Sequence, residues 1–295
     1  MISTKKSLVL KGSMLMIAGM LFASCNNNNT PKDENTENLT DSTVVSETEA
    51  TNNVFYSLPS PLQIASIFKK SGLKYQDGIT SDVKEPSKYT TSLLKSINLG
   101  IYSADLSYCV LNKQNQAAMN YMKLCRQLAD NLGMGSVFEQ NNLSKRFEKN
   151  LGNEDSLAYI IAELQMVTDM YLEENQQPQI TAIVFSGAWI ESMYLGSKLY
   201  ETSKDKTMGT KLSEQMTILG SIINALKVVK DKDPAIPSLI DDLQNIKNDY
   251  DKSPSVSAKT PSKDEEDEAE INLTENEITQ LTNKIKDLRT KFIKG

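Results

Sequence analysis

The sequence predicts an all-α protein, on three observations. Across residues 55–250 apolar residues recur at spacings of three and four, strict alternation is absent, and helix-capping signals recur. The connections between the predicted helices are short, which favours an antiparallel helical bundle or stacked helical hairpins. Around this domain we expect a disordered amino-terminal tether and a separate amphipathic helix at the carboxy terminus.

The first predicted helix lies in "SPLQIASIFKKSG". Ser60 is its cap, Pro61 its first residue, Gln63 completes a capping box, and Gly72 follows its end. Further helices are expected at 86–111, 116–132, 136–150, 154–175, 178–202, 207–230 and 236–250.

Residues 251–272 form a second polar segment, with six acids among residues 264–270. We interpret it as a flexible linker and not as a calcium site, because it lacks the EF-hand spacing and its central glycine. Over 273–295 a last helix begins with a capping box, Thr274 and Glu277. Its apolar face has barely two heptads, so it must dock on its own domain or on another chain. Docking on its own domain is favoured by the higher effective concentration.

The amino terminus has the features of an export signal over residues 1–24. Three lysines precede an apolar stretch at 14–22 that is too short to span a bilayer. Leu21, Phe22, Ala23 and Ser24 then lead to Cys25, a pattern that resembles the lipobox of bacterial lipoproteins, although that family most often has leucine where Phe22 stands. The resemblance implies that Cys25 becomes the first mature residue and carries acyl chains. The alternative is a signal peptide cleaved elsewhere, with Cys25 incidental.

Residues 25–54 would then be a lipidated tether, because their composition of Asn, Thr, Ser, Glu and Asp cannot form a core. A flexible chain of this length reaches about 30 Å. Within it "PKDENTE" loosely resembles the export tags of Bacteroidetes surface lipoproteins. We expect an outer-membrane anchor, in the periplasmic leaflet or at the cell surface, with the surface favoured.

Composition excludes several classes of function. The chain has no histidine, which removes Ser-His-Asp and Cys-His nucleophile systems and the common zinc sites. No catalytic motif and no metal or cofactor motif is present, so we expect a non-enzymatic protein without a cofactor. Loss of the first 24 residues takes the net charge from −6 to −9, which disfavours nucleic acid as a partner.

A candidate ligand site rests on carboxylates that lie in apolar helical stretches near aromatic residues. Its members are Asp105, Tyr108, Asp169, Trp189, Glu191 and Tyr194. If their helices converge, these side chains would line a pocket for a cation or a polar ligand. The simpler interpretation, which we favour, is that each acid accepts a hydrogen bond or faces water, and that Trp189 belongs to the core.

Two further expectations concern packing. Cys109 and Cys125 should be buried free thiols, since a hairpin turning near Lys113 would offset them by about 12 Å along the helices, beyond the reach of a disulfide. Small residues four apart, including Gly100 with Ala104, indicate a tight helix crossing in preference to a ligand groove.

The stretches "NLGIYSADLSY" and "GAWIESMYL" resemble helical domains of uncharacterised Bacteroidetes lipoproteins, a likeness that implies no known activity. We therefore expect a membrane-anchored helical module that binds a protein partner or an envelope component. The alternative is a small-ligand or cation binding protein that uses the helix carboxylates and tyrosines.

Overall fold

The computed structural model describes residues 60–70, 75–82, 86–258 and 271–295, which all belong to one unit. The predicted signal peptide, Cys25 and the tether lie outside the described residues, as do residues 259–270 of the predicted linker. Within the described residues every regular element is helical, which confirms the all-α prediction. No helix among them combines the length and the apolar character needed to cross a membrane.

The long helices fall close to the predicted ranges. They are α2 (Pro61–Lys70), α3 (Ser92–Leu111), α4 (Asn115–Asn131), α7 (Glu154–Glu174), α8 (Pro178–Ser203), α9 (Lys206–Val228), α10 (Ile236–Asp251) and α12 (Glu275–Lys294). The short elements are η1 (Pro86–Lys88), α5 (Gly135–Glu139), η2 (Gln140–Asn142), α6 (Leu143–Lys149), η3 (Lys230–Lys232) and α11 (Pro254–Ser257).

Both predicted capping boxes are present. At α2 the Ser60 amide donates to Gln63 Oε1 at 2.6 Å, and the Gln63 amide donates to Ser60 Oγ at 3.2 Å. At α12 the Thr274 amide donates to Glu277 Oε2 at 2.7 Å, and the Glu277 amide donates to Thr274 Oγ1 at 3.3 Å. Each box satisfies two backbone donors that a helix start leaves without partners.

Two of the predicted helices are longer than the helices in the structure. The helix expected over 86–111 begins at Ser92, because η1 is a separate turn and Thr91 caps α3 by accepting from the Leu94 amide at 3.1 Å. The helix expected over 136–150 is broken into α5, η2 and α6. Asn141 and Asn142 have φ angles of 49° and 54°, the left-handed region that asparagine tolerates better than most residues and that a continuous helix excludes.

The predicted tight crossing joins α3 and α8, the most extensively packed pair of helices. A Cβ atom on Gly100 would lie 2.0 Å from the Val184 carbonyl oxygen, and one on Gly187 would lie 2.0 Å from the Ile97 carbonyl oxygen. Only glycine lets the two backbones approach this closely from both sides. The crossing brings the following turns of α3 and α8 together, and these turns carry the candidate carboxylates.

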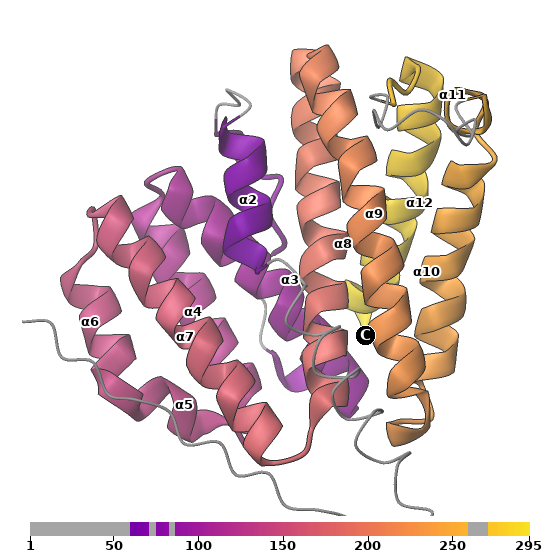
Figure 1. Ribbon diagram of the computed structural model, residues 1–295. Helices are drawn as coiled ribbons and strands as arrows, with labels where there is room; N and C mark the ends of the chain where they lie inside the picture. The colour runs from indigo at the N-terminus through magenta and orange to yellow at the C-terminus, as the bar shows by residue number, and fades with distance from the viewer. Residues whose placement is uncertain (1–59, 71–74, 83–85, 259–270) are drawn as a thin grey trace, which may run out of the picture. The chain divides into compact units, whose positions relative to one another are not determined.

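The pair α3 and α8 lies between two groups of helices (Figure 1). One group is α4 to α7, and the other is α9, α10 and α12. Helix α12 packs on α8, α10 and α3, so it docks on its own chain, with Ile278, Leu281, Ile285, Leu288 and Phe292 buried. The start of the predicted linker forms α11, and Ser255 in α11 donates to Glu277 in α12.

Candidate functional site

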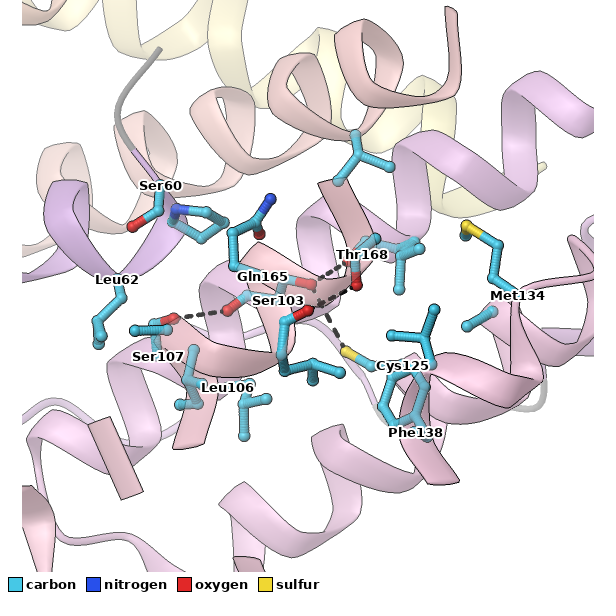
Figure 2. Close-up of a pocket in the computed structure, with 18 residues that line it drawn as sticks. Ser60, Leu62, Ser103, Leu106, Ser107, Cys125, Met134, Phe138, Gln165 and Thr168 are labelled. Carbon is cyan, nitrogen blue, oxygen red and sulfur yellow. Dashed lines mark hydrogen bonds between the residues drawn. The ribbon is translucent and has the colours of Figure 1, made fainter. Parts of the chain in front are cut away.

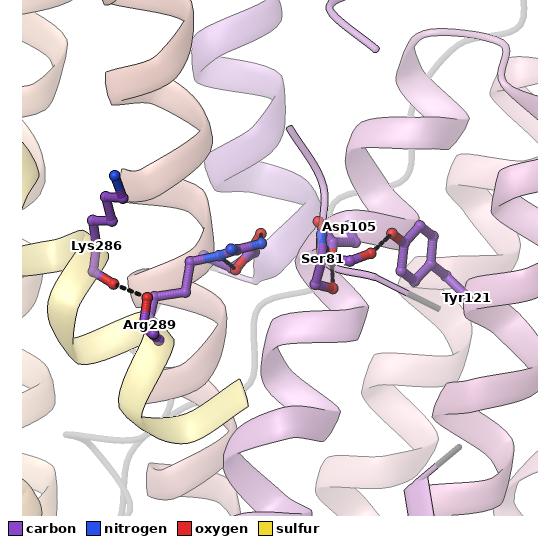
Figure 3. Close-up of polar contacts among 7 residues, drawn as sticks. Ser81, Asp105, Tyr121, Lys286 and Arg289 are labelled. Atoms are coloured by element: carbon purple, nitrogen blue, oxygen red, sulfur yellow. Dashed lines mark hydrogen bonds and ion pairs between the residues drawn. The ribbon is translucent and has the colours of Figure 1, made fainter. Parts of the chain in front are cut away.

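Two of the three candidate carboxylates meet at the centre of the unit. Asp105 on α3 and Glu191 on α8 both have no exposed surface. Arg289 reaches them from α12 and binds Glu191 through two hydrogen bonds, from Nε to Oε2 at 2.5 Å and from Nη2 to Oε1 at 2.7 Å (Figure 3). This two-point geometry is the strong form of an ion pair between arginine and a carboxylate.

Asp105 has a separate set of donors on its other side (Figure 3). The Ser81 amide donates to Asp105 Oδ2 at 3.1 Å, and the Ser81 hydroxyl donates to the same oxygen. The Tyr121 hydroxyl in turn donates to the Ser81 carbonyl oxygen. The segment before η1 is thereby fastened to α3 and α4.

The buried Asp105 carboxyl group favours its protonated form. Burial and then the neighbouring Glu191 carboxylate raise the pKa of Asp105 well above its usual range. Asp105 Oδ1 has no hydrogen-bond partner among the described residues, so no donor there opposes its protonation. Burial lowers the pKa of Arg289, but the Glu191 carboxylate more than offsets this effect and raises it. One neutral acid, one carboxylate and one guanidinium leave the cluster without net charge, as a buried site requires.

Of the candidate aromatic residues, Tyr194 belongs to this cluster and Tyr108 lies beside it. The Tyr194 ring lies under the guanidinium of Arg289, with 4.0 Å between Cζ and the ring centroid, a cation–π contact. Tyr108 stacks on Tyr75 at 5.6 Å between centroids, and its hydroxyl accepts from the Gln76 amide at 2.9 Å. Tyr194 therefore contacts α12 through Arg289, and Tyr108 contacts the segment that contains Tyr75 and Gln76.

The other two candidates lie elsewhere. Trp189 is fully buried in the core, and its Nε1 donates to the Gln215 carbonyl oxygen at 3.0 Å. Asp169 on α7 accepts from Gln165 on the same helix, at 2.9 Å to Oδ1 and 3.0 Å to Oδ2. Burial raises the pKa of Asp169 to about 6, although the Gln165 hydrogen bonds oppose the shift.

The carboxylate cluster is closed to ligands. None of the five main cavities in the described part of the chain is lined by Asp105 or Glu191. Acid–base catalysis needs a substrate atom within hydrogen-bond reach of the carboxyl group, and no such space adjoins these two. No group of three or more acidic or cysteine side chains in the described residues is arranged to hold a metal ion. The geometry therefore supports a role in holding α3, α8 and α12 together.

A small cavity lies among α2, α3, α4, α5, α7 and α8 (Figure 2). Its volume is about 50 Å³ and its walls are mainly apolar. The hydroxyls of Ser103, Ser107 and Thr168 in its wall each donate to the carbonyl four residues earlier, so they offer no free donor to a ligand. Ligand pockets usually measure roughly 300–1,000 Å³. This cavity is a packing gap between helices.

A wider hollow of about 570 Å³ opens between η1 and α4. Polar side chains line it, among them Lys95, Gln127 and Asp130. Its aromatic residue, Tyr89, is only 1% exposed, so the hollow presents no ring face on which a sugar or another flat ligand could stack. It is an open part of the surface with a mixed polar and apolar lining.

The outer face of α7 carries an exposed apolar stripe. Tyr159, Met166 and Met170 are 65%, 56% and 53% exposed, and Ala162 lies exposed between them. These four residues, the α7 stripe, are spaced by three and four and share one face of the helix. The opposite face is buried through Leu157, Ile160, Ile161, Leu164, Val167 and Leu172. Exposed apolar side chains gathered on one face are typical of a protein-binding surface.

Sequence reasoning missed Arg289, Ser81 and the α7 stripe. Arg289 had a signal, since it lies four residues after Ile285 at the edge of the apolar face of α12 and is one of only three arginines in the chain. The α7 stripe also had a signal in the sequence, because the apolar residues of α7 are too many to fit on one buried face of the helix. Ser81 had none, since its role depends on the folding back of the segment before η1.

Comparison of the chain with protein-family models, with curated proteins and with solved structures finds no match. The chemistry of its own residues is therefore the basis for a functional proposal.

Proposed function

We propose that this protein is a lipid-anchored, non-enzymatic binding module of the cell envelope that recruits a protein partner through the α7 stripe. The observation that carries the proposal is the stripe itself, which leaves Tyr159, Met166 and Met170 more than half exposed on a domain whose core is otherwise filled. Small-ligand binding has no comparable support, because Asp105 and Glu191 pair within a closed cluster.

The anchor is supported by the amino-terminal sequence. Cys25 follows an apolar signal with small residues directly before it, and the tether after it is long enough to hold the domain clear of the headgroups. Two or more acyl chains are needed for durable attachment, and lipoprotein processing supplies them.

A photo-crosslinking amino acid at Met166 tests recruitment in intact cells that make the protein. The matched control places the same amino acid at Val228, which is 51% exposed and lies on α9. We expect a discrete crosslinked protein from position 166 and none from position 228. Equal crosslinking from both positions, or none from either, would contradict recruitment through α7.

Membrane fractionation of a Cys25→Ala variant tests the anchor. The wild-type chain should sediment with membranes and require detergent for release, whereas the processed variant should be released without detergent. A variant that stays in the membrane fraction after signal cleavage would overturn the lipid attachment. Protease treatment of intact cells should degrade the wild-type domain if it is displayed on the surface.

A further inference from the structure

We infer that the α7 stripe binds an amphipathic helix with basic residues at both ends of its apolar face. The inference rests on the proposed function and adds the chemistry of the partner. Its basis is the distribution of charge around the stripe.

The stripe has an acid beyond each end. Asp155 lies four residues before Tyr159, and Glu174 lies four residues after Met170, so both fall on the same face as the stripe. Both acids are exposed. At 1.5 Å per residue, the stripe from Tyr159 to Met170 is about 17 Å long and the two acids lie about 29 Å apart along the helix, which matches a partner helix with about three apolar turns and a basic residue beyond each end.

The surrounding field is also acidic. Residues 151–177 contain six acids and no lysine or arginine. Two cations from neighbouring helices pair with acids of α7, Arg146 of α6 with Glu163 at 2.8 Å and Lys69 of α2 with Glu154. Asp155 and Glu174 have no such ion pair among the described residues, so a basic partner would be attracted mainly at the two ends of the stripe, and an acidic one would be repelled there.

A hollow beside Tyr159 offers a place for a basic side chain. It measures about 350 Å³ and is lined by residues that include Arg146, Asp155, Ser156 and Tyr159. A lysine or arginine of the partner could reach the Asp155 carboxylate there while its stem covers the Tyr159 ring. The two methionines have flexible, polarizable side chains that adapt to the partner's apolar residues.

Two other occupants fit less well. A second copy of this chain would place acid against acid in either orientation, because Asp155 would meet Asp155 in a parallel pair and Glu174 in an antiparallel pair. A bilayer surface that carries anionic lipids would be repelled by the same acids. Charge complementarity therefore favours a helix with basic ends.

A peptide-display selection tests the inference. The library holds helical peptides of about 20 residues with a constant apolar stripe at i, i+3, i+4 and i+7 and with flanks varied among Lys, Gln and Glu. It is selected on the full chain and counter-selected on the Met166→Lys/Met170→Lys variant. We expect Lys at both flanks to be enriched at least about tenfold over Glu, a difference of about 1.4 kcal/mol.

The variants supply the controls. Asp155→Lys/Glu174→Lys should reverse the preference towards Glu, while Val228→Lys and Asp241→Lys, on other helices, should leave it unchanged. No enrichment over the counter-selection, or enrichment of Gln or Glu on the wild-type chain, would overturn the inference. If position 166 crosslinks to a partner through a segment without basic ends, the proposed function stands and this inference falls. Crosslinking to a second copy or to lipid would overturn both.

Discussion

At the scale of single residues, the buried pair Asp105 and Glu191 has a clear thermodynamic consequence. An acid whose pKa is raised on folding binds its proton more tightly in the folded protein than in the unfolded chain. Its contribution to stability is complete below the unfolded pKa, about 4, and is lost as the pH rises through the folded pKa. The chain has no histidine, so few other side chains titrate near neutral pH to obscure this effect.

We therefore predict that an Asp105→Asn variant is less sensitive to alkaline pH than the wild type. Asparagine has the shape of the protonated acid, and its amide can donate to Glu191 while its oxygen accepts from Ser81. Urea denaturation between pH 5 and 9 should give a free energy of unfolding that falls with pH more steeply in the wild type than in the variant, by at most about 1.4 kcal/mol per pH unit for one group.

The matched control for this experiment is Asp169→Asn. Burial raises the pKa of Asp169 only to about 6, so that group is mostly ionised at pH 7 and its loss should leave the slope above pH 7 unchanged. Equal slopes for the wild type and the Asp105→Asn variant would contradict the raised pKa of Asp105.

The two cysteines of the domain should be chemically inert in the folded state. As predicted, both are free and buried, and burial raises the pKa of each thiol to about 12. The thiolate is the reactive form, and it is scarce at pH 8 at such a pKa. In a Cys25→Ala chain we expect no reaction with Ellman's reagent before unfolding and reaction of both thiols in urea. Rapid labelling of Cys109 or Cys125 in the folded protein would contradict the packing of α3 on α4.

At the scale of secondary-structure elements, the crossing of α3 and α8 depends on glycine. A Gly187→Ala variant would place a methyl group 2.0 Å from the Ile97 carbonyl oxygen, so the helices must separate. We predict a loss of about 1–3 kcal/mol or more in stability, the usual range for overpacking. The control is Gly220→Ala on α9, whose added methyl has its nearest neighbour, Lys247 Cε, at 3.7 Å. That variant should gain up to about 1 kcal/mol from helix propensity. Thermal denaturation followed by circular dichroism measures both, and similar effects at the two sites would refute the crossing.

Local signals account for most of the helices that the sequence predicts. The capping boxes at Ser60 and Thr274 act over three residues, so they are visible without tertiary structure. The break at Asn141 and Asn142 was missed because their left-handed conformation also depends on how α5 and α6 pack. The sequence did carry one local sign of the break, because Phe138 and Leu143 are five residues apart and the four residues between them are polar.

The candidate site could be predicted only in part, for a physical reason. The isolation of Asp105 and Glu191 in apolar helices signals that each needs a partner, and the structure brings the two together. Which residue neutralises them depends on the docking of α12, whose Arg289 lies 98 residues from Glu191. Sequence spacing within one helix carries no information about such a contact.

At the scale of the whole molecule, polar contacts hold the last helix, α12, to the rest of the domain at three points along its length. Glu277 near its start accepts from Ser255 of α11, Arg289 in its last third pairs with Glu191, and Asn98 donates to the Phe292 carbonyl oxygen near its end at 3.0 Å. Together with its buried apolar face, these contacts make α12 part of the domain. The polar residues before it do not separate it into an independent unit.

Removal of Arg289 should therefore destabilise the whole domain in a way that depends on pH. An Arg289→Met variant leaves Glu191 buried without its cation, and breaking a buried pair in this way costs about 3–5 kcal/mol. The uncompensated charge is present only while the carboxylate is ionised, so the deficit in the free energy of unfolding should be largest at pH 8 and smaller at pH 5. Urea denaturation at the two pH values measures it.

A double-mutant cycle separates the charge from the packing of α12. Glu191→Gln combined with Arg289→Met removes the uncompensated carboxylate, so the double variant should be more stable than Arg289→Met alone, with a coupling energy well above 1 kcal/mol. Methionine keeps the apolar stem over Tyr194, which limits the loss of packing. A deficit that is the same at pH 5 and pH 8 and is not relieved by Glu191→Gln would mean that Arg289 holds α12 through its stem alone, and that the buried ion pair contributes nothing to joining α12 with α8.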